Sequence, residues 1–190
     1  MTKVLPAPIA RAAPAPGDFC CVPISGRVGR GIEIAQWLSG DRFQPYDHAE
    51  VYVGQADAQG PHGYSISAYP GGQGRRPLPC PPAKLPGSLW SSGLIALTDT
   101  ERSAIIAWAM VHQDVSYSEL DYLALTAHTL HIPVPHLKAY IESTGHLICS
   151  QFTDADYASA GVHLFSDNRW PGFVKPGDLA MLLQELMAQA

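Results

Sequence analysis

Two β-rich segments on either side of a turn constrain this chain more than any other feature. His48–Gly54 alternates in polarity, so that Val51 and Val53 share one face of an extended strand. The segment Gly60–Gly63 is typical of a turn, and Tyr64–Tyr69 follows it as the returning strand. The sequence therefore predicts a β-hairpin, and with it an antiparallel sheet.

Helical signals lie in separate blocks of the chain. Thr98 and Glu101 have the spacing of a capping box, and the helix that they open should bury Ile105 and Ala109. We also expect helices at 30–38, 121–130, 149–160 and 177–190, and short strands at 19–23 and 94–97. Because strands and helices occupy different blocks, the expected class is α+β, with an antiparallel sheet packed against helices.

Length and composition indicate the domain organisation and exclude several classes of partner. The 190 residues suit one domain with a single core, and the Ala/Pro-rich segment 1–17 predicts an extended arm before a folded domain at 18–190. Seventeen acidic residues against twelve basic ones leave a net charge of −5, which argues against nucleic acid as a partner. No apolar run approaches the roughly 18 residues of a membrane span. The N-terminus lacks the apolar stretch of a secretory signal, which predicts a cytoplasmic protein.

The chain has four cysteines, and we interpret all of them as reduced thiols. No two of them have the spacing of zinc ligands, so the sequence predicts no metal site and no cofactor. Cys20 and Cys21 lie in an expected strand, where a small apolar side chain most often serves packing. Cys80 lies in a proline-rich loop with no matching base.

Cys149 stands at the start of an expected helix, which makes it the candidate nucleophile. The free N–H groups and the positive end of the helix dipole favour a thiolate at this position. A buried packing residue is the other interpretation, since free cysteine is among the most buried residue types. A nucleophilic thiol also needs a base, and His48 opens the β-rich segment. His146 lies closer in sequence, and the group at 128, 131 and 136 is interpreted as surface histidines.

Several short segments together resemble circularly permuted papain-like hydrolases of the NlpC superfamily, in the YiiX-like branch related to lecithin–retinol acyltransferases. The segments follow the order of that family and span most of residues 16–180. They are Pro16-Gly-Asp-Phe-Cys20, Tyr46-Asp-His-Ala-Glu-Val-Tyr-Val-Gly54, Tyr64-Ser-Ile-Ser-Ala68 with Pro70-Gly-Gly72, Val115-Ser-Tyr117 through Asp121-Tyr122, Ile148-Cys-Ser-Gln-Phe152 and Pro176-Gly-Asp-Leu179.

The resemblance implies a papain-like, circularly permuted fold with His48 as general base and Cys149 as nucleophile. The returning strand has Ser67 where relatives place a glutamate or histidine that orients the base. A hydroxyl can accept the imidazole N–H but cannot stabilise an imidazolium as a carboxylate would. Glu50 shares the strand face of His48 and is a possible substitute, although a solvated carboxylate is an equally good interpretation.

The remaining site residues are candidate hydrogen-bond donors to the oxyanion that forms when the thiol attacks the substrate carbonyl. Its first donor would be the backbone N–H of Cys149 at the helix terminus. Tyr46 and Gln151 are the side-chain candidates, and Gln151 departs from the glutamate that relatives often have there.

The expected function is hydrolysis of an amide bond of the peptide or peptidoglycan type. One alternative is an acyltransferase or thioesterase that uses the same pair, with an apolar groove formed by Leu179–Met187. Another is a catalytically silent binding module, which Ser67 in the orienting position favours.

Overall fold

The computed structural model describes residues 12–23, 46–69, 74–115, 147–167 and 170–190. The helices expected at 30–38 and 121–130 lie outside these ranges. Within them the chain is α+β, as predicted: a five-stranded antiparallel sheet packs against three helices.

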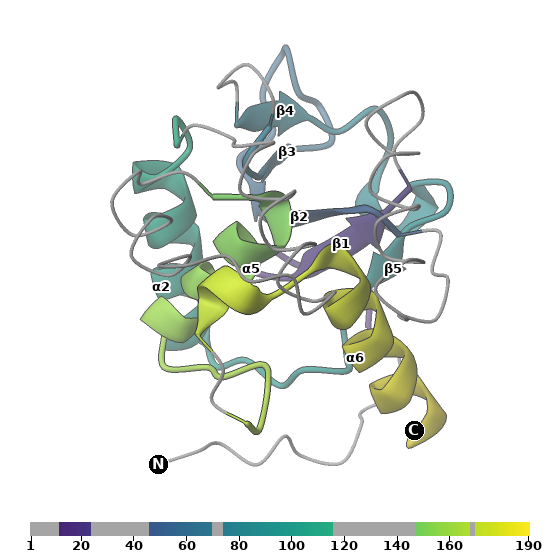
Figure 1. Ribbon diagram of the computed structural model, residues 1–190. Coiled ribbons are helices and arrows are strands. Elements are labelled where there is room, and N and C mark those ends of the chain that lie inside the picture. The colour runs from purple at the N-terminus through teal and green to yellow at the C-terminus, as the bar shows by residue number, and fades with distance from the viewer. Residues whose placement is uncertain (1–11, 24–45, 70–73, 116–146, 168–169) are drawn as a thin grey trace.

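The sheet has the strand order β4-β3-β2-β1-β5, so that β2 lies at its centre (Figure 1). Its strands are β1 (Phe19–Val22), β2 (His48–Gly54), β3 (Tyr64–Ile66), β4 (Arg75–Pro77) and β5 (Leu89–Trp90). The predicted hairpin is confirmed, because β2 and β3 are paired antiparallel with Val51 opposite Ile66. The returning strand ends at Ile66 rather than at Tyr69; beyond it, the Ser67 N–H still bonds to the carbonyl of Gly74, the next position in the β3–β4 register.

Three helices pack on the sheet, and α5 contacts both α2 and α6 (Figure 1). They are α2 (Asp99–Val111), α5 (Cys149–Ser159) and α6 (Pro176–Ala188), and two short 3-10 turns are η1 (Pro82–Lys84) and η2 (Pro171–Phe173). The capping box of α2 is confirmed: the Thr98 N–H donates to Glu101 Oε2 over 2.7 Å. After α5, Gly161 has a φ of +77°, the left-handed conformation that ends helices and favours glycine.

The strand expected at 94–97 is wrong. The N–H groups of Leu94 and Ile95 both bond to the carbonyl of Ser91, which makes this segment a turn. The strand that pairs with β1 is β5, just before that turn. The proline-rich stretch interpreted as loop also contains β4, which lies at the sheet edge, where a terminal proline is tolerated.

One core lies between the sheet and the helices. Alternation along β1 and β2 sends every second side chain into it, and α5 and α6 supply the opposite wall. The largest fully buried side chains are Tyr157, Phe19, Phe152, Ile66, Ile95, Ile105, Ile148, Leu179, Leu183 and Gln151. None of the described helices is both long and apolar enough to cross a bilayer.

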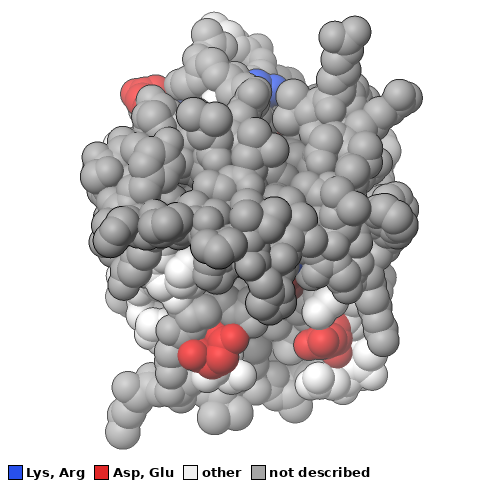
Figure 2. Space-filling view, in the orientation of Figure 1, with Lys and Arg blue, Asp and Glu red and all other residues white. Residues whose placement is uncertain are grey.

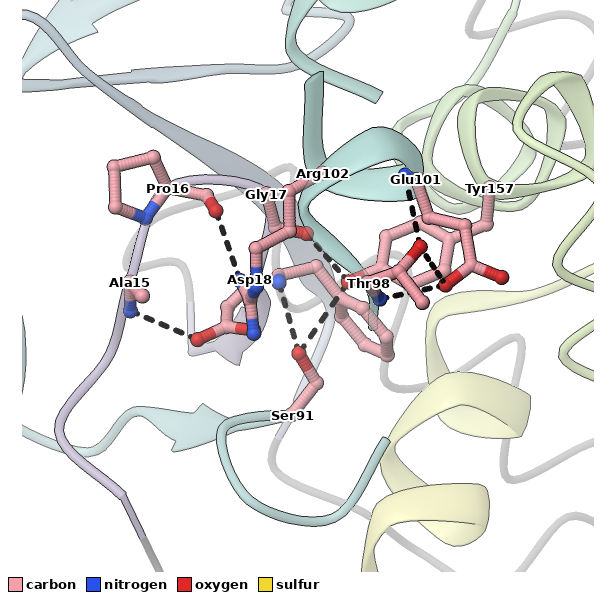
Figure 3. Close-up of polar contacts among 10 residues, drawn as sticks. Ala15, Pro16, Gly17, Asp18, Ser91, Thr98, Glu101, Arg102 and Tyr157 are labelled. Carbon is pink, nitrogen blue, oxygen red and sulfur yellow. Dashed lines mark hydrogen bonds and ion pairs between the residues drawn. The ribbon is translucent and has the colours of Figure 1, made fainter. Parts of the chain in front are cut away.

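A buried polar cluster fixes the start of the domain to α2 and α5 (Figure 3). Asp18 is 1% exposed, and its carboxylate lies 3.0 Å from Nη1 of Arg102 and accepts the Ala15 N–H over 2.8 Å. The Tyr157 hydroxyl donates to the carbonyl of Gly17 over 2.7 Å. The last residues of the Ala/Pro-rich segment are therefore bonded to the body of the domain.

Candidate active site

Helix α5 brings Cys149 to the beginning of strand β2. Cys149 is the first residue of α5, and its thiol donates to the carbonyl of Asp47 with an Sγ to O distance of 4.0 Å. Asp47 directly precedes His48, so the fold places the two predicted site segments side by side although they are 102 positions apart. The thiol is enclosed, because Cys149 is 1% exposed.

The N-cap side chain of α5 makes no hydrogen bond with the first turn of the helix. The N-cap residue, Ile148, carries no hydrogen-bonding group on its side chain, while its own backbone N–H donates to the Gln151 side chain. Burial raises the pKa of Cys149 to about 12, and the backbone N–H groups of Ala49 and Ser150 oppose that rise. The helix terminus was expected to favour a thiolate, but desolvation outweighs it and the resting thiol is neutral.

His48 lies on the opposite side of β2 from Ala49, because neighbouring strand residues alternate. It is 3% exposed, and its Nε2 lies 3.5 Å from Oε1 of Glu50. Burial lowers the pKa of His48 to about 4; the carboxylate of Glu50 raises it and the guanidinium of Arg76 lowers it further. Nε2 has no hydrogen-bond partner in the described part of the chain, so the resting imidazole is neutral and Nε2 does not hold the thiol.

Glu50 is held against the imidazole by two hydroxyl groups. Ser65 donates to Oε2 over 2.5 Å, and the Tyr69 hydroxyl donates to Oε1. The Tyr69 ring also packs against the His48 ring, with 4.6 Å between their centroids. The sequence analysis missed Ser65 and Tyr69, although period-two alternation along 64–69 places both on the face that faces Glu50.

Ser67 does not reach the base. Its hydroxyl donates to the carbonyl of Ala49 over 2.6 Å and is buried. The resemblance gave Ser67 the orienting position, but the structure places Glu50 beside Nε2 of His48 instead. The difference arises because β2 supplies its own carboxylate two residues after the histidine.

Gln151 is also placed differently from the prediction. Its Oε1 accepts the N–H of Ile148 over 2.9 Å and its Nε2 donates to the carbonyl of Gly172 over 2.7 Å. With both ends of the amide engaged and the side chain buried, Gln151 ties α5 to η2 and is not a free oxyanion donor. Tyr46 is half-buried before β2 and packs against the core; its role as an oxyanion donor stays a prediction.

Among the other cysteines, Cys21 is paired with Ala49 across β1 and β2, and burial and the nearby Cys149 raise its pKa. All four cysteines are free thiols; Cys20 and Cys21 are buried, and Cys80 is partly exposed. The histidines at 128, 131, 136 and 146 lie outside the described residues. Within the described ranges, no three His, Cys, Asp or Glu side chains are grouped as metal ligands would be. A cavity of about 300 Å³ lies farther along α5, lined by Asp154, His163, Phe165 and Trp170 among others.

Comparison with known proteins leaves the family open. A scan against models of protein families found no match, and no curated protein matched the chain significantly. The likeness to NlpC-type hydrolases therefore stays a prediction.

Proposed function

We propose that the protein is a cysteine hydrolase that cleaves an amide bond, of the peptide or peptidoglycan type, through Cys149 and His48. The observation that carries the proposal is the contact between the Cys149 thiol and the Asp47 carbonyl. It places a cysteine at a helix N-terminus, whose N-cap side chain makes no hydrogen bond, next to the strand that begins with a buried histidine. The carboxylate of Glu50 beside that histidine supplies the third member of the group.

The reaction begins from the neutral pair. His48 takes the thiol proton while the sulfur of Cys149 attacks the substrate carbonyl, so charge separates only as the bond forms. Nδ1 is the nitrogen that we assign to this proton, because Nε2 faces Glu50. The oxyanion is stabilised by backbone N–H groups in the first turn of α5.

The remaining steps return both groups to their starting state. The imidazolium gives its proton to the leaving amine, which departs and leaves an acyl-thioester on Cys149. His48 then deprotonates a water molecule that attacks the thioester. The carboxylic acid product leaves, and the sulfur recovers its proton from the imidazolium. Glu50 stabilises the imidazolium in both steps, which a serine hydroxyl would do poorly.

Acylation of the thiol tests the proposal without a known substrate. The protein is incubated with p-nitrophenyl acetate in a Cys80→Ser background, which removes the partly exposed thiol. Intact mass and peptide mapping should show one acetyl group on Cys149 that disappears with time as p-nitrophenol release continues. Cys149→Ala should show neither the adduct nor turnover, and Cys21→Ala, a second buried thiol, is the matched control.

A catalytically silent binding module is the second candidate. The enclosed thiol and the absence of a thiol bond to Nε2 favour it. In that case the wild type and Cys149→Ala release p-nitrophenol at the same rate and no adduct forms on Cys149. That result would overturn the hydrolase proposal.

A further inference from the structure

Arg76 lies one ring away from the candidate base. Its guanidinium carbon is 3.7 Å from the centroid of the Tyr69 ring, whose centroid is in turn 4.6 Å from that of His48. Arg76 is opposite Ser65 in the β3–β4 pairing, so both side chains lie on the sheet face that carries Glu50. The guanidinium, the phenol and the imidazole therefore form one tilted stack, in which the two rings meet at 44°.

The outer end of this stack is exposed, and no acidic side chain in the described ranges forms an ion pair with it. Arg76 is an exposed residue, and the ion pairs among the described residues join His48 to Glu50 and Arg102 to Asp18. Figure 2 shows a small spot of Lys or Arg atoms toward the upper end of the face shown. A guanidinium fixed over an aromatic ring keeps its N–H groups free for a further acceptor.

We propose that Arg76 is a specificity-determining residue that binds an anionic group, a carboxylate or a phosphate, next to the scissile acyl bond of the substrate. This inference rests on the proposed function, because it needs the reaction to occur at Cys149. Guanidinium groups bind both kinds of anion through paired N–H donors, and they do so better than a lysine ammonium.

The electrostatics of the stack give such an anion a second effect. The positive charge of Arg76 lowers the pKa of His48 and so opposes formation of the imidazolium. An anion bound to Arg76 cancels part of that repulsion and makes His48 a better proton acceptor when the substrate is in place. Neutral substrates lack this gain.

The same strand supplies a matched control. Arg75 stacks on Tyr64 at 4.0 Å, with nearly the same geometry as Arg76 on Tyr69. It precedes Arg76 by one residue, so its side chain points to the other face of β4. Arg75→Gln removes an equivalent stacked charge from a place where the substrate should not bind.

The test compares two alkylating agents of similar size on Cys149, anionic iodoacetate and neutral iodoacetamide, in the Cys80→Ser background. Arg76→Gln should lower the ratio of the iodoacetate rate to the iodoacetamide rate by about fivefold, the loss of one screened charge interaction. Arg76→Lys should lower it less, and Arg75→Gln should leave it unchanged. Acetate and inorganic phosphate are then added to the iodoacetamide reaction, and the anion that accelerates modification of Cys149 at lower concentration identifies the preferred group.

Three outcomes are distinguishable. A ratio that falls only in the Arg76 variants, with acceleration of the iodoacetamide reaction by either anion, supports the inference. An unchanged ratio in Arg76→Gln, or equal slowing of both reagents as expected of a purely structural arginine, overturns it and leaves the hydrolase proposal standing. If neither reagent modifies Cys149 in the wild type, the hydrolase proposal and the inference fail together.

Discussion

Oε1 of Glu50 lies 3.5 Å from Nε2 of His48, two residues earlier on the same strand. The pair is part of a buried group in which Ser65 and Tyr69 donate to the carboxylate. The base and its orienting carboxylate thus come from one strand, whereas the nucleophile arrives on a helix that is distant in sequence.

Replacing Glu50 with glutamine should slow acylation of Cys149 by about 10–100-fold, because the imidazolium loses its neighbouring charge. The carboxylate raises the pKa of His48, so its loss lowers that pKa and moves the acid limb of the rate profile to lower pH. The p-nitrophenyl acetate assay across pH measures both effects.

Asp57→Asn is the control for this change, since Asp57 accepts a tyrosine hydroxyl over 2.7 Å in the way that Glu50 does. It belongs to the β2–β3 turn region and should leave the profile unchanged. An acid limb that stays in place in Glu50→Gln would show that Glu50 does not act on the base.

Ser67→Ala should leave the shape of the pH–rate profile unchanged. Its hydroxyl bonds to the Ala49 carbonyl rather than to the imidazole, so the loss is one buried hydrogen bond. Urea denaturation should show a decrease of about 1 kcal/mol in the free energy of unfolding. A shift of the acid limb would instead mean that Ser67 orients His48 during the reaction.

Local sequence patterns predicted the elements that are determined by residues close together in the sequence. The β2 strand, the capping box of α2 and the start of α5 each follow from residues within a few positions of one another. The pairing of β4 depends on a partner strand elsewhere in the sheet and was missed. The turn at Leu94 was also missed, although it is formed by local bonds to Ser91, because its apolar residues resemble those of a strand. The same distinction applies to the site: Cys149 and His48 were recognisable, but the partner of His48 depended on strand pairing.

Gln151 stands where the NlpC-type hydrolases often have glutamate, and this difference allows a stability test. In Gln151→Glu a carboxylate can still accept the N–H of Ile148, but it faces the Gly172 carbonyl where the amide donated. The variant should lose about 2 kcal/mol at neutral pH. The buried Glu should have a raised pKa in the folded state, so stability should return as the pH falls and the acid regains a proton to donate.

Urea denaturation of Gln151→Glu near pH 4 and near pH 7 checks this prediction, with Gln184→Glu as a surface control on the exposed side of α6. Equal destabilisation at both pH values would show that charge at this position is not the cause. The loss of stability would then come from altered packing alone.

Asp156 makes the stability of the protein depend on pH between about pH 4 and pH 9. It is fully buried on α5, and neither carboxylate oxygen has a hydrogen-bond partner among the described residues. Burial raises its pKa to about 9. Because the folded state holds this proton more tightly than the unfolded state, stability falls as the pH rises from the ordinary aspartate pKa of about 4.

Asp156→Asn should therefore show a flatter decline in the urea midpoint between about pH 5 and pH 9 than the wild type. Asp154→Asn, two residues earlier on the same helix, is the comparison variant. A wild-type midpoint that rises over this range, or the same slope in Asp156→Asn, would show that the folded protein does not hold Asp156 in its protonated form.

The pH dependence of Cys149 alkylation by iodoacetamide, in the Cys80→Ser protein with and without His48→Gln, tests most directly whether histidine and cysteine act together. With His48 present, the rate should be nearly constant through neutral pH and fall only as the imidazole is protonated near its pKa of about 4. His48→Gln should react about a hundredfold more slowly at neutral pH and accelerate only with hydroxide. Identical rates for the two proteins at every pH would show that the thiol reacts without the imidazole, and would contradict the proposed mechanism.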